Sequence, residues 1–175
     1  ENVNAPCKVV FDVLDELNNT LDMDGYVTTE PNGPYKPISN YNYDTANELT
    51  VLGNEATITN LVVKGDAEAG VFGKVLGSIE KLNVTNSTFI GKERVGSIVG
   101  HILGNVENCN ADTVAVTAVP YKNGSEWDGG NSVGALVGYL EGDSDNGPFY
   151  NVKNSSAKNA KVTGFRDAGA LIGTA

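Results

Sequence analysis

The sequence predicts an all-β fold, a parallel β-helix or β-solenoid with an N-terminal capping helix. Two observations lead to this fold class. Short segments of alternating apolar and polar residues are broken by Gly and Asn, and the whole pattern recurs at a spacing of about 27 residues. Strands this short cannot bury a face alone, whereas stacked coils pair in parallel and share one core. We expect right-handed coils, because right-handed crossovers dominate parallel connections.

Residues 1–50 are the predicted N-terminal cap. An amphipathic helix is predicted at about residues 8–21, where apolar residues follow helical spacing with acidic residues between them: Val10, Leu14, Leu17 and Leu21. The Pro- and Tyr-rich stretch at 25–50 is predicted to be extended chain leading into the first coil. Covering the open first coil is the predicted role of this segment, and a peptide-binding role is the alternative.

Residues 51–175 form the predicted solenoid. The stretch 71–80 matches 98–107 at a shift of 27, and further copies begin at Val133 and Ala168. Insertions at about 119–132 and 143–151 lengthen the spacing but keep the frame, so they belong in turns. The copies align into inward apolar columns: Val71, Ile98, Leu136 and Leu171; Val75, Ile102 and Leu140; Ile79, Val106 and Val152; Phe89, Val116 and Val162.

Glycines recur at fixed places in these copies: Gly73, Gly96, Gly100, Gly134, Gly138, Gly169 and Gly173. The segments Gly134-Ala135-Leu136-Val137-Gly138 and Gly96-Ser97-Ile98-Val99-Gly100, the latter followed by Val106-Glu107-Asn108-Cys109, resemble the GLUG motif of bacterial surface proteins. The resemblance covers about residues 35–175 and departs from the motif at Ala69, which stands where the leading Gly is expected. It implies a β-solenoid in an exported, adhesin-like protein, or an accessory region of metallopeptidases that cleave immunoglobulin A. The motif has no known chemistry and brings no catalytic residues.

A second apolar column follows the first one. Strict alternation points it outward as a flat strip: Phe72, Val99, Val137 and Ile172. Contiguous apolar strips are seldom left open to water. We therefore expect the helix, the insertions or a second copy of the chain to cover it. The alternative is a bulge at Gly73, Gly100 and Gly138 that turns the column inside.

Composition excludes several classes of partner. The net charge of −10 disfavours nucleic acid and anionic membranes, and no stretch is long and apolar enough for a transmembrane segment. No signal peptide is recognisable at Glu1. Cys109 falls at a core position beside Leu82 and Ser155, so we predict a buried, reduced thiol, and a disulfide with Cys7 is the alternative.

The sequence predicts no catalytic, cofactor or metal site. The single histidine, His101, shares its column with Lys74 and Tyr139, which makes it a solvent-facing position. Outward columns mix carboxylates with lysine, unlike the clustered carboxylates of polysaccharide-active enzymes, although a carbohydrate-active β-helix enzyme is an open alternative. The turn beginning at Asp143 resembles half of a calcium loop, but Asn154 stands where the bidentate Glu is needed.

The two insertions and the strand between them hold the candidate ligand surface. Aromatic side chains there stand beside carboxylates, as in sugar-binding sites: Tyr121, Trp127, Tyr139, Phe149 and Tyr150. The alternative is that these rings fold back onto the solenoid. The predicted function is a non-catalytic binding module on the surface of a bacterium or outside it, with a host, matrix or glycan ligand. A structural spacer without a ligand of its own is the second interpretation.

Overall fold

The computed structural model describes residues 7–11, 19–24, 35–40, 48–65, 67–142 and 149–175. These residues form an all-β structure with parallel sheets and contain no helix. The largest sheet has 11 strands and runs in the order β1-β3-β6-β9-β16-β21, with β2, β10, β11, β17 and β18 at its sides. Its strands are β1 (Cys7–Val10), β2 (Thr20–Asp22), β3 (Leu49–Thr59), β6 (Phe72–Thr85), β9 (Val99–Leu103), β10 (Val106–Glu107), β11 (Asn110–Asp112), β16 (Val137–Leu140), β17 (Val152–Lys153), β18 (Ser156–Lys158) and β21 (Ile172–Thr174).

Two four-stranded sheets and one hairpin complete the structure. One sheet contains β4 (Val62–Lys64), β7 (Thr88–Gly91), β12 (Ala115–Ala118) and β19 (Lys161–Thr163). The other contains β5 (Glu68–Ala69), β8 (Arg94–Val95), β15 (Val133–Gly134) and β20 (Ala168–Gly169). The hairpin contains β13 (Pro120–Asn123) and β14 (Glu126–Gly129) and is the antiparallel pair among the described strands.

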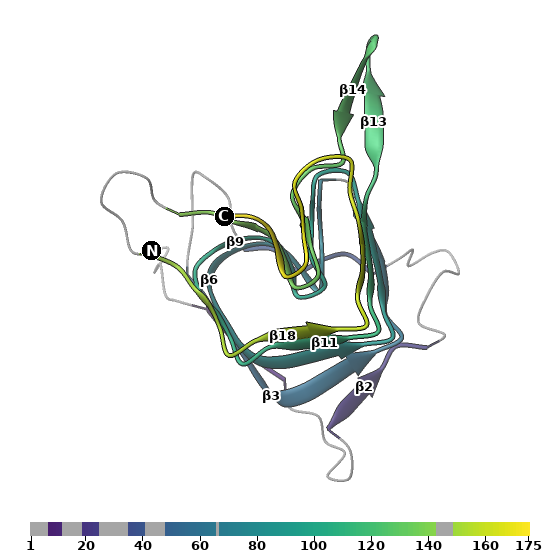
Figure 1. Ribbon diagram of the computed structural model, residues 1–175. Helices are drawn as coiled ribbons and strands as arrows, with labels where there is room; N and C mark the ends of the chain where they lie inside the picture. The colour runs from purple at the N-terminus through teal and green to yellow at the C-terminus, as the bar shows by residue number, and fades with distance from the viewer. Residues whose placement is uncertain (1–6, 12–18, 25–34, 41–47, 66, 143–148) are drawn as a thin grey trace.

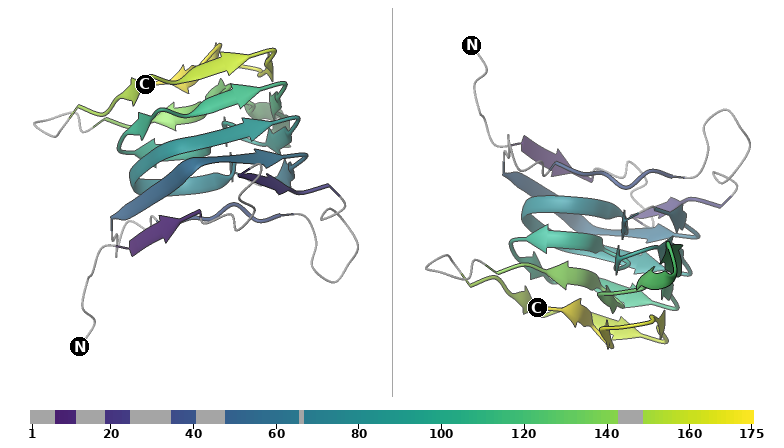
Figure 2. Two further views of the ribbon diagram at one scale, coloured as in Figure 1. Left: turned by 90° about the horizontal axis from the view of Figure 1, so that it is seen from below. Right: turned by 90° about the horizontal axis from the view of Figure 1, so that it is seen from above.

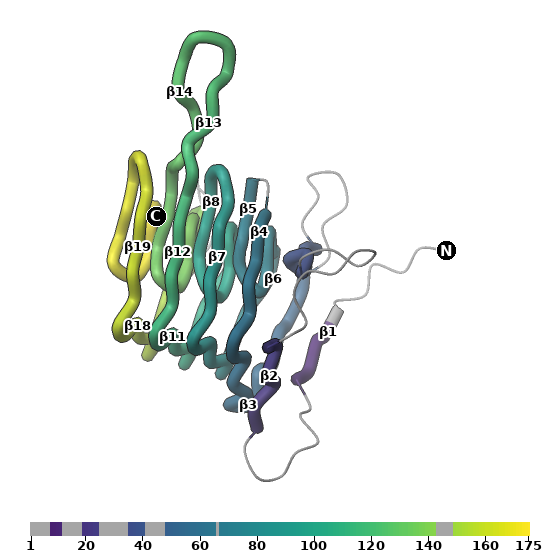
Figure 3. Tube along the Cα trace, turned by 90° about the vertical axis from the view of Figure 1, so that its right-hand side faces the viewer, coloured from purple at the N-terminus to yellow at the C-terminus, as the bar shows by residue number. Residues whose placement is uncertain are grey.

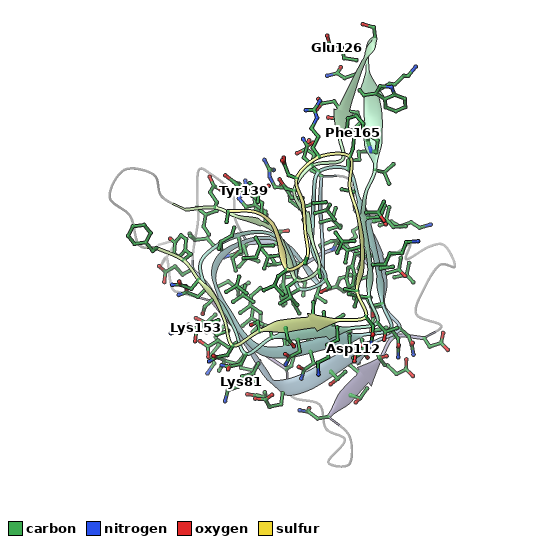
Figure 4. All side chains as sticks on the ribbon, viewed as in Figure 1. Lys81, Asp112, Glu126, Tyr139, Lys153 and Phe165 are labelled. Atoms are coloured by element: carbon green, nitrogen blue, oxygen red, sulfur yellow. The ribbon has the colours of Figure 1, made fainter. Side chains whose placement is uncertain are left out.

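The chain runs repeatedly through the 11-stranded sheet and the two four-stranded sheets, and one complete turn through them is a coil. Equivalent strands of successive coils pair in parallel, as Val116 does with Phe89 and Val162. The side views show the coils lying one on another (Figure 2). This register confirms the predicted columns at Ile79, Val106 and Val152. The outward residues Asp112 and Lys153 lie on the outside of the sheet (Figure 4).

The predicted helix at about 8–21 is wrong. Residues 12–18 lie outside the described part, but both flanks are strands: β1 pairs with Leu49–Leu52 and β2 pairs with Thr57–Thr59. The first long strand, β3, would otherwise present unpaired N–H and C=O groups along its open edge. Main-chain pairing at that edge satisfies these groups, which a packed helix could not do.

The second apolar column is buried and does not form an outward strip. Phe72, Val99 and Val137 are fully buried although they directly follow the buried Val71, Ile98 and Leu136. The cause is a fold-back: the chain leaves β8, turns into the interior at Gly96–Ile98 and returns as β9 in another sheet (Figure 1). Strict alternation does not hold through such a turn. The chain itself covers these three residues of the strip, and Ile172 in the last coil is partly buried.

Glycine makes the fold-back possible, because two backbones meet there without side chains between them. A Cβ on Gly96 would lie 2.4 Å from the carbonyl oxygen of Val99 and 2.5 Å from that of Leu136. In the first copy, the leading Gly position is not occupied by Ala69 as expected from the sequence. Ala69 pairs with Val95, while Phe72 pairs with Val99, so this copy is one residue shorter and Gly70 takes the leading Gly position.

The predicted core position of Cys109 is confirmed. The side chain is fully buried and the thiol is free, and its backbone N–H donates to Ser155 Oγ at 3.0 Å. Burial raises the pKa of this thiol to about 11, so the reactive thiolate is scarce at neutral pH.

We expect Cys109 to resist thiol reagents in the folded protein. In a Cys7→Ser variant, where Cys109 is the remaining thiol, a maleimide should react only after denaturant is added. Rapid labelling of the native variant would show that the Cys109 column is open to solvent.

Candidate functional site

The β13–β14 hairpin is the most prominent feature outside the stack. It projects beyond the coils, which run on beneath it without a change of register (Figure 3). It lies between β12 and β15, where the preceding coil passes directly from β7 to β8. The predicted insertion at 119–132 is therefore a hairpin. At its neck, Gly129 and Gly130 have positive φ values of 72° and 68°, a conformation that Gly adopts readily.

The hairpin holds two of the five predicted ligand-surface residues, Tyr121 and Trp127. Trp127 is 54% exposed, and Lys122, its cross-strand partner, holds its Nζ 5.4 Å from the indole centroid. Tyr121 pairs across the strands with Asp128, and its hydroxyl lies 3.5 Å from Asp128 Oδ2. The negative charge of Asp128 raises the pKa of Tyr121. The hairpin thus carries an exposed Trp127–Lys122 pair on one face and a half-buried Tyr121–Asp128 pair on the other.

A further aromatic residue, Phe165, stands at the neck of the hairpin (Figure 4). Its ring is 53% exposed, and the guanidinium carbon of Arg166 lies 5.6 Å from the ring centroid. Its backbone N–H donates to the carbonyl oxygen of Gly130 at 2.8 Å. Phe165 is not among the five residues predicted from the sequence. One feature of the sequence points to Phe165. The fourth copy has a short turn without an insertion, so this turn lies against the hairpin neck of the preceding coil.

The other three predicted residues lie elsewhere. Tyr139 is on β16, well away from the hairpin tip marked by Glu126 (Figure 4). Phe149 is 94% exposed, and Tyr150 packs partly against the core and lines a shallow pocket with Thr50, Ser78 and Asn105. Residues 143–148, which include the calcium-like turn, lie outside the described part of the chain. The five residues therefore do not form one surface.

His101 is not the solvent-facing residue that the sequence analysis predicted. It is 1% exposed, and its Nε2 lies 2.5 Å from Glu141 Oε2. The expected column of Lys74, His101 and Tyr139 is present, and the Tyr139 ring packs against the imidazole at a tilt of 42°, with ring centroids 4.9 Å apart. Of this column, His101 alone is buried, and Lys74 and Tyr139 are half-buried. The repeat does not point to Glu141, because this residue follows the last column residue, Leu140, and lies next to an insertion.

The neighbouring charges are paired with one another. Arg94 Nη1 lies 3.0 Å from Glu68 Oε1 and 3.6 Å from Glu93 Oε2, and the guanidinium carbon is 5.5 Å from the Tyr139 ring centroid. Within the described ranges, no three His, Cys, Asp or Glu side chains are grouped so that they could hold a metal ion. The arrangement joins three coils at the fold-back. It leaves the imidazole out of reach of a substrate.

The burial of His101 predicts a pH effect on stability. Burial lowers the pKa of His101 below 6.5, and it outweighs the opposite effect of the Glu141 hydrogen bond. The folded state therefore favours the neutral imidazole, so its stability is complete above pH 6.5 and is lost as the pH falls through the lowered pKa. Urea unfolding of the parent and of His101→Gln should show a smaller loss between pH 7 and pH 5 in the variant. Equal losses would contradict the burial of a neutral imidazole.

Comparison with known proteins gives one informative similarity. No protein-family model and no solved structure matches the chain. The chain is similar to Halomucin of Haloquadratum walsbyi, with 31% identity over 137 residues. The match covers 74% of this chain but 1% of Halomucin, so the similar stretch is one small part of a far longer protein. Among the described residues, no helix is long and apolar enough to cross a membrane.

Proposed function

We propose that the chain is a parallel β-solenoid module of a longer extracellular protein on a bacterial surface, and that its β13–β14 hairpin binds a glycan, host or matrix ligand without catalysis. The exposed Trp127 on a projecting hairpin carries this proposal. The hairpin is an addition to coils that keep their register without it. An insertion that the core does not need is a common place for a binding function.

The chemistry of the hairpin tip favours sugars. An exposed indole stacks on the apolar face of a sugar ring, while carboxylate and ammonium groups bond to its hydroxyls. Trp127 and Lys122 supply the ring and the ammonium group on one face of the hairpin, and Asp128 pairs with Tyr121 on the other face. The absence of catalysis is part of the proposal, because His101 is enclosed and Arg94 is paired with Glu68 and Glu93.

A structural spacer is the second candidate. The similarity to 1% of the very long Halomucin supports a role as one unit among many. The parallel register, which continues from β3 to β21, supports it as well. A spacer needs no ligand, so binding experiments separate the two functions.

The test is an array of glycans and extracellular matrix proteins probed with the labelled chain. We expect binding to at least one class, with at least about fivefold weaker binding by Trp127→Ala, since a stacked aromatic anchor contributes more than about 1 kcal/mol. Phe149→Ala is the matched control, because Phe149 is an even more exposed ring away from the hairpin. Absence of binding, or an equal loss of affinity in both variants, would contradict binding by the hairpin and favour the spacer function.

A further inference from the structure

The last coil forms an open end of the stack. Its strands β17, β18, β19, β20 and β21 pair with β10, β11, β12, β15 and β16, respectively. In the described part of the chain, no strand pairs with their other edges. Figure 2 shows these strands at one end of the molecule. A row of N–H and C=O groups without a strand partner therefore runs along this end of the 11-stranded and the two four-stranded sheets.

Apolar side chains of the core are uncovered at the same end. Val152, Val162 and Leu171 are only partly buried. Their column partners one coil earlier, Val106, Val116 and Leu136, are fully buried. The residue types are the same, so the difference comes from the missing neighbour. Unpaired edges together with open core residues are unfavourable in water.

The opposite end of the stack is partly covered, although Val10, Leu21 and Ile38 are exposed there. There β1 and β2 pair with β3, and Tyr35 and Ile38 form bridges to Val63 and Phe72. Among the described residues, segments that cover the stack in this way lie beside β3 and not beside the last coil. The edges of the last coil therefore offer a surface for a partner.

We propose that this end binds one further coil of the same kind, paired in parallel and in the same register. The coil-to-coil interface already occurs within the chain, and the last coil repeats its donors, acceptors and apolar columns. The partner is thus a polypeptide segment with apolar residues at the inward positions and a Gly-x-x-x-Gly turn. This surface is separate from the hairpin and does not depend on hairpin binding.

Glycine at the fold-back supports a following coil. A Cβ on Gly96 would lie 2.5 Å from the Leu136 oxygen, and one on Gly134 would lie 2.6 Å from the Gly173 nitrogen, both in the next coil. Gly169 occupies the same place in the last coil, since it pairs with Gly134. The next backbone can therefore approach the last coil as closely as it approaches the earlier ones.

The test appends a copy of residues 76–101 after Ala175. Thr174 occupies the column of Lys74 and His101, so the appended segment continues the register with one regular coil. We expect amide hydrogen exchange at β19 and β21 to slow by at least about tenfold, because their free edges become paired. The appended residues should become protected as well, and the unfolding midpoint should rise.

The matched control carries the same segment with its copies of Ile79, Leu82, Val84 and Phe89 changed to Ser. This control should leave exchange at β19 and β21 as fast as in the parent. Equal protection with both segments, or no protection with either, would overturn the proposal. It would also be overturned if sedimentation shows that the parent is a dimer with β21 already protected, because the occupant would then be a second copy.

Discussion

Gly138→Ala should destabilise the protein by about 3 kcal/mol, the upper end of the cost of overpacking a filled interior. A Cβ at this position would lie 2.4 Å from the carbonyl oxygen of Gly100 and 2.5 Å from the backbone nitrogen of Val95. Both neighbours are backbone atoms of different strands, so neither can move without shifting the fold-back. Urea unfolding followed by circular dichroism measures the loss.

Gly142→Ala is the matched control for this substitution. No heavy atom lies within 4 Å of the Cβ that this change would add, and Gly142 is not among the residues with positive φ. Its unfolding midpoint should match that of the parent. If Gly138→Ala also matches the parent, the two backbones do not approach each other as described.

Val99→Lys should prevent folding or destabilise the protein by several kcal/mol, because an uncompensated ammonium group would enter the apolar core. Val99 is fully buried in the second column, together with Phe72 and Val137. The change distinguishes the observed buried column from an outward strip. The measurement is the free energy of unfolding, with the yield of folded protein as a second readout.

Val119→Lys is the comparison, since Val119 is 44% exposed and its side chain can reach water. We expect this variant to fold with stability close to that of the parent. A folded Val99→Lys variant of parental stability would place the second column on the surface.

The repeat was enough to predict the inward columns and the parallel pairing. Residues such as Ile79, Val106 and Val152 meet in the structure as the aligned copies predict, because the insertions lie in turns and leave the strand register intact. The fold-back was not predictable from alternation, which assumes an uninterrupted strand. Two adjacent apolar residues flanked by Gly, as at Ile98 and Val99, were the signal for a turn into the core.

The N-terminal segment shows the limit of periodicity. Val10 and Leu21 fit a helix by spacing, but their backbones are used to pair with β3. An open sheet edge offers main-chain partners that a sequence pattern does not reveal. The same limit applies to His101, whose environment depends on Glu141 and on strands from other coils.

The candidate site was predictable in part. Insertions that keep the frame led to Tyr121 and Trp127, which the hairpin presents together. Their distance from Tyr139 and the place of Phe165 at the neck depend on where each turn leaves the stack. That geometry follows from the three sheets and not from local sequence.

Inter-strand nuclear Overhauser effects test the central claim, a stack of parallel coils, most directly. We predict backbone contacts between residues one coil apart, such as Phe89 with Val116 and Val116 with Val162, and antiparallel contacts between Lys122 and Trp127 of the hairpin. Antiparallel contacts between strands that are neighbours in the sequence, such as β7 with β8 or β11 with β12, would contradict the parallel stack.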